Sequence, residues 1–211
     1  MKAQRRVLST STPRRLALFG LTLLLTMAVA AQAFAGAPTE FVKKKSDELF
    51  GIVNQPVGDA RTNAMKKEVR ALVNYEELAS RALGVHWKSR TDVEKKEFIE
   101  LLEQLVELNY ANRFKDKSGD KTYDVKYIDE KVREGSGMAL VKTSIKYGAD
   151  NFEIHYKLLS KAEAYVIFDI VFDDISLEET YRDSYVPIIE KEGWGSLIKR
   201  MKDKLAELKK R

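Results

Sequence analysis

Apolar residues between Pro38 and about Phe114 recur every three to four positions, which is the spacing of amphipathic helices. In Asn74-Tyr75-Glu76-Glu77 and Thr91-Asp92-Val93-Glu94, a polar residue stands three positions before an acid, a signature of helix starts. The pattern therefore predicts four helices, which begin near Pro38, after Asp59, after Asn74 and after Thr91.

The last of these helices is apolar around about half of its circumference. Its apolar residues are Phe98, Leu101, Leu102, Leu105, Val106, Leu108 and Tyr110. A helix at the surface of a domain usually has a narrower apolar stripe. This helix is therefore expected to pack on more than one side or to face a cavity.

After residue 120 the period of the apolar residues changes from 3.6 to 2, which indicates strands. Three segments, near residues 123–127, 139–147 and 152–158, follow this pattern, and a continuous apolar segment, residues 165–172, comes after them. Short turns join them, so we expect an antiparallel meander. The first three have one polar face, whereas the fourth is apolar on both faces and should be covered on both sides.

Two further helices are predicted at the end of the chain. Ser176-Leu177-Glu178-Glu179 begins the first, and the second has a stripe formed by Leu197, Met201, Leu205 and Leu208. The sequence thus predicts a single α+β domain, residues 36–211, with a four-stranded curved antiparallel sheet and helices packed on one face. Residues 36–115 form its helical part, 122–172 its sheet and 176–211 its C-terminal helices.

Residues 1–35 have the features of a secretory signal peptide. Basic residues precede an apolar run, residues 16–31, and Ala33-Phe34-Ala35 has the small-x-small pattern of a cleavage site. The run is shorter than the roughly 20 residues of a membrane-spanning helix. We expect cleavage after Ala35 and export to the periplasm. A twin-arginine route through Arg14-Arg15 and a retained anchor are the alternatives.

The charge and the cysteine content exclude several classes of protein. Five of the 37 basic residues precede the first acid, Glu40, so the remainder has 32 bases against 32 acids. A neutral body argues against nucleic-acid binding, which needs clustered positive charge, and suggests a monomer. The absence of cysteine excludes disulfides, thiolate metal sites, cysteine nucleophiles and a lipoprotein anchor.

Sequence patterns of catalysis, cofactors and metal binding are not found. No G-x-S-x-G, G-x-G-x-x-G or Walker pattern occurs, and neither His86 nor His155 lies in an H-E-x-x-H. A calcium loop starting at Asp116 would need glycine where Lys121 stands. Asp169 is either a buried polar residue in a strand or one half of an acid–base pair. The basic C-terminal helix is either a solvated face or a contact with anionic lipid.

Two segments resemble a known family. Leu83-Gly84-Val85-His86-Trp87 resembles the "L-G-x-x-W" segment of the toluene-tolerance/MlaC family. Tyr165-Val166-Ile167-Phe168-Asp169-Ile170, followed by Ile175-Ser176-Leu177 and Tyr181-Arg182, resembles its aromatic strand and the helix that follows. The order and spacing hold from about residue 38 to 208.

The resemblance implies a periplasmic phospholipid carrier. Such proteins shuttle lipid between an outer-membrane lipoprotein complex and an inner-membrane ABC transporter, within a system that maintains lipid asymmetry. The implied fold encloses the acyl chains in an apolar pocket. Two chains of about 16 carbons contain about 30 methylenes, whose exposure to water would cost on the order of 25 kcal/mol. Such a carrier needs no nucleophile, metal or cofactor.

The residues expected to line this pocket come from the long helix and from one face of the sheet. They are Leu101, Leu105 and Tyr110 on the helix, and Val125, Tyr127, Val141, Ile145, Ile154 and Tyr156 on the sheet. Arg182, carried over by family position, is expected at the mouth, or as a structural residue paired with Asp169 or Glu178.

Three alternatives remain open from the sequence. The cargo of a carrier with this fold could be a hopanoid-type polycyclic lipid. The protein could be a small α+β enzyme that acts on a hydrophobic substrate through Asp169 and His155, although His155 is expected on the polar face of its strand. It could also be an adaptor with a dense core and no cavity.

Overall fold

The computed structural model describes residues 36–114, 123–162 and 164–210, with the side chains of the longest helix described as far as Asn109. The chain divides into two compact units, Met1–Ala37 and Pro38–Arg211, and the second contains the elements described below. The predicted signal peptide and its cleavage site lie outside the described residues, as does the Asp116 loop.

In the described residues, five helices precede the strands along the chain and two helices follow them. The helices are α1 (Ala37–Val53), α2 (Asp59–Leu72), α3 (Tyr75–Leu83), α4 (Val85–Lys88), α5 (Asp92–Phe114), α6 (Leu177–Glu192) and α7 (Trp194–Leu208). The predicted N-caps form. Asn74 Oδ1 accepts from the backbone N–H of Glu77 at 2.9 Å, and the Ser176 hydroxyl accepts from that of Glu179 at 3.1 Å.

The segment between these two groups of helices forms one antiparallel sheet of five strands, in the order β1-β2-β3-β4-β5. The strands are β1 (Tyr123–Arg133), β2 (Met138–Tyr147), β3 (Asp150–Lys161), β4 (Ala164–Phe172) and β5 (Ile175–Ser176). The prediction of four strands was therefore wrong. The fifth has two residues, too few to show alternation, and pairs with Val171 and Phe172. Asp173 and Asp174, both with positive φ, form the turn before it.

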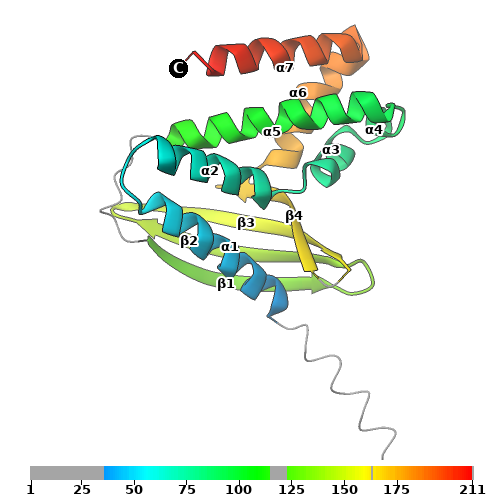
Figure 1. The fold of residues 1–211 in the computed structure, drawn as a ribbon. Coiled ribbons are helices and arrows are strands. Elements are labelled where there is room, and N and C mark those ends of the chain that lie inside the picture. The colour runs from blue at the N-terminus through cyan, green and yellow to red at the C-terminus, as the bar shows by residue number, and fades with distance from the viewer. Residues whose placement is uncertain (1–35, 115–122, 163, 211) are drawn as a thin grey trace, which may run out of the picture. The chain divides into compact units, whose positions relative to one another are not determined.

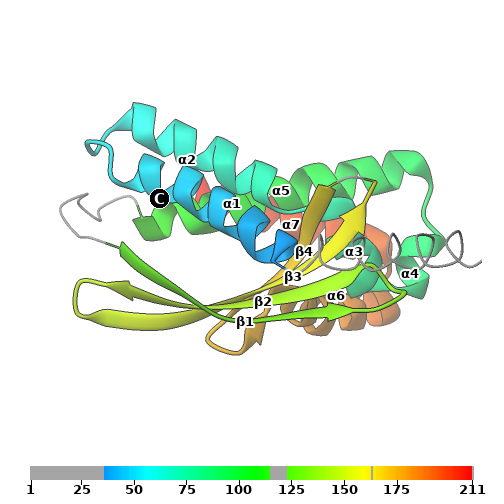
Figure 2. The ribbon, with the colours of Figure 1, turned by 90° about the horizontal axis from the view of Figure 1, so that it is seen from below.

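The helices are stacked above the sheet. In Figure 1, α1 and α2 lie over it, α5 lies beyond α2, and α7 lies beyond α5. Figure 2 shows that β4 runs in a clearly different direction from β1, so the sheet is strongly twisted, and the long strands β1 and β2 bend along their length. The broad apolar surface of α5 is explained by its neighbours, because α2 packs against one side of it and α7 against another.

The core lies between the sheet and the helices. Alternate residues of β2 are buried on this side of the sheet: Ala139, Val141, Thr143, Ile145 and Tyr147. From the helices, Val42, Leu78 and Leu102 are almost completely buried in the same core. Arg61, which is also buried, donates from Nη1 to the carbonyl oxygen of Val53 at 3.1 Å and so ties the start of α2 to the end of α1.

β4 is covered on both faces, as its sequence predicted. Ile167 and Ile170 face the core, while Phe168 and Asp169 are buried on the other side. The guanidinium of Arg81, on α3, lies 4.0 Å from the centre of the Phe168 ring. α3 and α6 therefore cover the sheet at β4. The other part of the sheet faces α1 and α2, and the space between them is described next.

Candidate functional site

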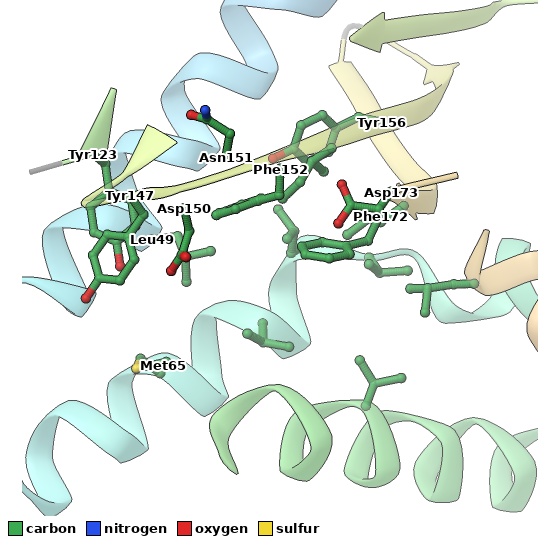
Figure 3. A pocket seen from close by; sticks show the side chains of 17 residues that line it. Leu49, Met65, Tyr123, Tyr147, Asp150, Asn151, Phe152, Tyr156, Phe172 and Asp173 are labelled. Atoms are coloured by element: carbon green, nitrogen blue, oxygen red, sulfur yellow. The ribbon is translucent and has the colours of Figure 1, made fainter. Parts of the chain in front are cut away.

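A largely apolar cavity of about 450 Å³ lies between the helices and the concave side of the sheet. Its helical wall consists of Leu49 on α1, Met65, Val69 and Leu72 on α2, Val73, Val106 on α5 and Leu177 on α6. Its sheet wall consists of Tyr123, Tyr147, Phe152, Ile154, Tyr156, Ile170 and Phe172. Figure 3 shows the two walls facing each other across the opening. This is the geometry of a site for an apolar ligand.

The polar groups of the cavity lie at its sheet ends. Asp150, Asn151 and Asp173 are exposed to solvent, and Figure 3 shows Asp150 beside Tyr147 and Leu49. Phe152 and Phe172, which are adjacent in sequence to Asn151 and Asp173, stack with their ring centres 5.4 Å apart and line the cavity next to these polar groups. A ligand can therefore keep a hydrated end at this rim while its apolar part is buried.

Two tyrosine rings, Tyr123 and Tyr147, line one end of the cavity, and Phe50 stacks behind Tyr123. The ring of Tyr123 lies between those of Phe50 and Tyr147, with 4.4 Å between centres on each side. Burial, with the neighbouring Tyr147 phenol as a second cause, raises the pKa of Tyr123 above its ordinary value. The Tyr123 phenol is thus held even more firmly in its neutral form, so it offers the cavity an apolar ring face with an uncharged hydroxyl at its tip.

A second hollow, of about 500 Å³, lies between α1 and β1. It is lined by Lys43, Asp47, Phe50, Gly51 and Asn54 from α1 and the residues after it, and by Tyr123, Val125 and Tyr127 from β1. Tyr123 lines both spaces. The second hollow is more open and contains charged residues of both signs.

The residues expected at the pocket fall into five groups. Ile154 and Tyr156 line the cavity, and Val125 and Tyr127 line the second hollow. Four are buried in the core without lining either space: Leu101, Leu105, Val141 and Ile145. The side chain of Tyr110 lies outside the described residues. Arg182 is exposed on α6 and forms an ion pair with Glu178, one helical turn earlier.

Several lining residues were not among those expected. Met65, Val69 and Leu72 recur at helical spacing on α2, so the pattern could have identified them as an inward stripe but not as part of a cavity wall. Phe152 shares its strand face with Ile154 and Tyr156, so the alternation of β3 could have identified it. Ile170 and Phe172 were harder to find, because β4 is apolar on both faces and its pattern does not distinguish them.

The candidate catalytic groups have structural partners. Asp169, which is fully buried, lies 2.8 Å from the ammonium of Lys157, and its oxygens accept from the Ser176 hydroxyl at 2.6 Å and the Glu178 N–H at 3.0 Å. It therefore stabilises the start of α6. His155 lies on the other face of β3 and pairs with Glu153. Among the described residues, no group of three or more His, Asp or Glu side chains could bind a metal ion.

The basic residues of α7 are mostly paired with acids. Lys199 with Asp203, Arg200 with Glu192, Lys202 with Glu97 and Lys204 with Glu207 all have nitrogen–oxygen distances of 2.6 to 2.9 Å. Because these charges are locally compensated, α7 is a solvated face more than a cationic surface for anionic lipid.

No helix in the described parts of the chain is long and apolar enough to cross a membrane.

Comparison with known proteins gives the family. The family model described as MlaC protein matches residues 43–203, which is most of the described domain. The chain belongs to the MlaC family. The resemblance seen in the sequence is thereby confirmed, and the matched range contains every residue that lines the cavity.

Two relatives extend this result. The MlaC of Haemophilus influenzae, an intermembrane phospholipid transport system binding protein, is 23% identical over 205 residues, which cover 89% of this chain and 92% of the relative. A phospholipid-binding protein from Ralstonia solanacearum, solved in complex with a phospholipid, has the same fold with a TM-score of 0.70 at 16% identity. That alignment covers 80% of this chain and 97% of the other. The predicted α+β fold with an antiparallel sheet is confirmed.

Proposed function

We propose that this protein is a periplasmic phospholipid carrier whose cavity holds acyl chain while the headgroup stays in water. The apolar cavity between α2 and the sheet is the observation that carries the proposal. The names of the two relatives support it, because one is a phospholipid transport binding protein and the other was solved with a phospholipid.

The size of the cavity fits an acyl chain. A methylene packed at protein density occupies about 27 Å³, so 450 Å³ accommodates about 16 of them, one chain of ordinary length. Burial of that chain contributes about 13 kcal/mol at about 0.8 kcal/mol per methylene. A second chain requires further room, which an outward movement of the helical wall or the neighbouring hollow would provide.

The rest of the proposed role follows from the family. The carrier would receive lipid from one membrane complex and deliver it to another, an outer-membrane lipoprotein complex and an inner-membrane ABC transporter. Binding of acyl chain by burial alone is reversible, so the protein equilibrates lipid between its partners. No catalytic step is part of this proposal, and the contacts of Asp169 with α6 supply a structural reason for the buried carboxylate.

Native mass spectrometry of the full-length chain, expressed in a Gram-negative host and purified without detergent from the periplasmic fraction, tests the proposal. We expect a protein mass that begins at Gly36, with a stoichiometric adduct of phospholipid mass. An adduct of polycyclic-lipid mass would instead favour the hopanoid carrier. A ligand-free mass that persists after incubation with phospholipid vesicles would refute the carrier function.

A further inference from the structure

The main cavity has room for one acyl chain and not for two. Its volume of about 450 Å³ corresponds to about 16 methylenes at protein packing density. A phospholipid with two chains of about 16 carbons needs about twice that volume. A second chain would therefore have to displace the helical wall or enter the neighbouring hollow, and the structure opposes both.

The helical wall is held in place by what packs behind it. Met65 and Val69 on α2 and Val106 on α5 line the cavity, yet all three are buried. α2 packs against α5 and α5 against α7, and Arg70 of α2 forms an ion pair with Glu107 of α5 at 2.5 Å. An outward movement of α2 would have to carry α5 and α7 with it, which exposes the apolar core between helices and sheet to water.

The hollow between α1 and β1 does not extend the cavity. Tyr123 lines both spaces, and its ring stacks on Phe50 on one side and on Tyr147 on the other, with 4.4 Å between ring centres in each pair. Rings at this distance are in contact, so they separate the two spaces. The hollow also contains Lys43 and Asp47, which are poor neighbours for a methylene chain.

We propose that the cargo of this cavity is a single-chain phospholipid, a lysophospholipid, with its one acyl chain in the cavity. The inference rests on the proposed carrier function and names its substrate class. The headgroup lies at the polar rim of Asp150, Asn151 and Asp173, which are exposed to solvent. The single chain is then buried along its whole length, whereas a second chain on the same headgroup stays in contact with water.

The experiment uses two series of lipids with the same phosphoethanolamine headgroup. In the first series, a single chain lengthens from about 10 to about 20 carbons, on either side of the length that the cavity holds. In the second, a chain of about 16 carbons is kept and a second chain lengthens from about two to about six carbons, within the range where these lipids stay monomeric at low concentration. Affinity for the purified protein is measured by displacement of a fluorescent lysophospholipid.

Each methylene that the protein buries should raise affinity about fourfold. In the first series, affinity should rise by this factor per methylene up to about 16 carbons and then level off. In the second series it should stay level, because the second chain gains no apolar contact. A rise of about fourfold per methylene in the second series would overturn the inference, and so would a first series that never levels off.

A pair of variants tests whether this cavity sets the limit. Met65 and Met201 are both 2% exposed, but only Met65 lines the cavity, and Figure 3 shows it on α2, across the opening from Asn151 and Asp173. Met65→Ala frees about 70 Å³, room for about three more methylenes, so affinity should level off at about 19 carbons. The matched control Met201→Ala should leave the limit at about 16.

Circular dichroism checks that both variants are folded. An unmoved limit in folded Met65→Ala, or the same shift in both variants, would show that another site holds the chain and would overturn the inference. The two lipid series on the wild-type protein decide the question without the variants if a truncated core does not fold.

The results also separate this inference from the proposed function. If both chains of the second series contribute to affinity, the single-chain assignment is wrong and the carrier function stands. If the wild-type protein binds no lipid of either series, the inference and the carrier function are refuted together.

Discussion

Replacement of Ile154 by tryptophan is a direct test of the cavity. Ile154 is on β3 and lines the sheet wall opposite α2. It is only half-buried although the core surrounds it, because its side chain faces the empty space. A larger side chain at this position can therefore extend into the cavity without pushing the backbone of the sheet apart.

The expected loss can be worked out from volumes. Tryptophan is about 60 Å³ larger than isoleucine at protein packing density, the room of about two methylenes out of the 16 that the cavity holds. Two methylenes left without apolar contact cost about 1.6 kcal/mol. That is about a 15-fold weaker affinity for a chain of the same length.

Affinity is measured by displacement of a fluorescent fatty acid, with competitors of increasing chain length. The variant should prefer chains about two carbons shorter than the wild-type protein prefers, since the far part of the cavity is filled. The control is Glu153→Trp, the adjacent residue, whose side chain is exposed and on the outer face of β3. It adds the same ring outside the cavity and should leave both affinity and chain preference unchanged.

If folded Ile154→Trp binds every chain length as tightly as the wild-type protein does, the acyl chain does not occupy this cavity. If Glu153→Trp weakens binding to the same extent, the effect comes from a general disturbance of the sheet and the cavity is not the acyl-chain site.

Three further predictions concern the core and the polar interior. Val141→Trp should lower stability by about 1–3 kcal/mol in urea unfolding, because Val141 is fully buried and lines no cavity; an unchanged midpoint would show unrecognised space beside it. Asp169→Asn should cost about 3 kcal/mol or more by the same assay, because Lys157 loses its buried partner and α6 loses a cap, while the folded fraction still binds lipid. Lipid binding lost at full stability would argue instead for a direct role of Asp169. Burial raises the pKa of Tyr185 to about 12, against about 10 in the unfolded chain. The unfolded form therefore loses this proton first, and stability should fall as the pH rises from 10 towards 12. Tyr185→Phe should make that fall shallower, and an identical pH dependence in the variant would contradict the assignment.

Local signals explain why most elements could be predicted. The N-caps at Asn74, Thr91 and Ser176 act within one helical turn, so their residues carry the information needed to place a helix start. The alternation of β2 and β3 identifies the buried face for the same reason, since successive side chains point to opposite sides of a strand. The two-residue β5 carries no such signal and was missed.

Local sequence patterns do not distinguish residues that line the cavity from residues that are buried in the core. Val141 and Tyr156 are direct partners across β2 and β3 and share the buried face, yet Tyr156 lines the cavity and Val141 does not. The alternation assigns both to the inside of the sheet. Whether an inward side chain meets a neighbour or a space depends on which helix lies opposite, and no local pattern carries that information.

The sequence was sufficient for the family, the class of fold, the antiparallel order of the strands and the inward faces of helices and strands, because each depends on residues close together in the chain. The cavity depends on where α1 and α2 lie over the curved sheet, which is decided by packing between segments that can be more than a hundred residues apart. Packing of that kind brings Met65 and Val69 opposite Ile154 and Phe172, and it leaves the space between them unfilled.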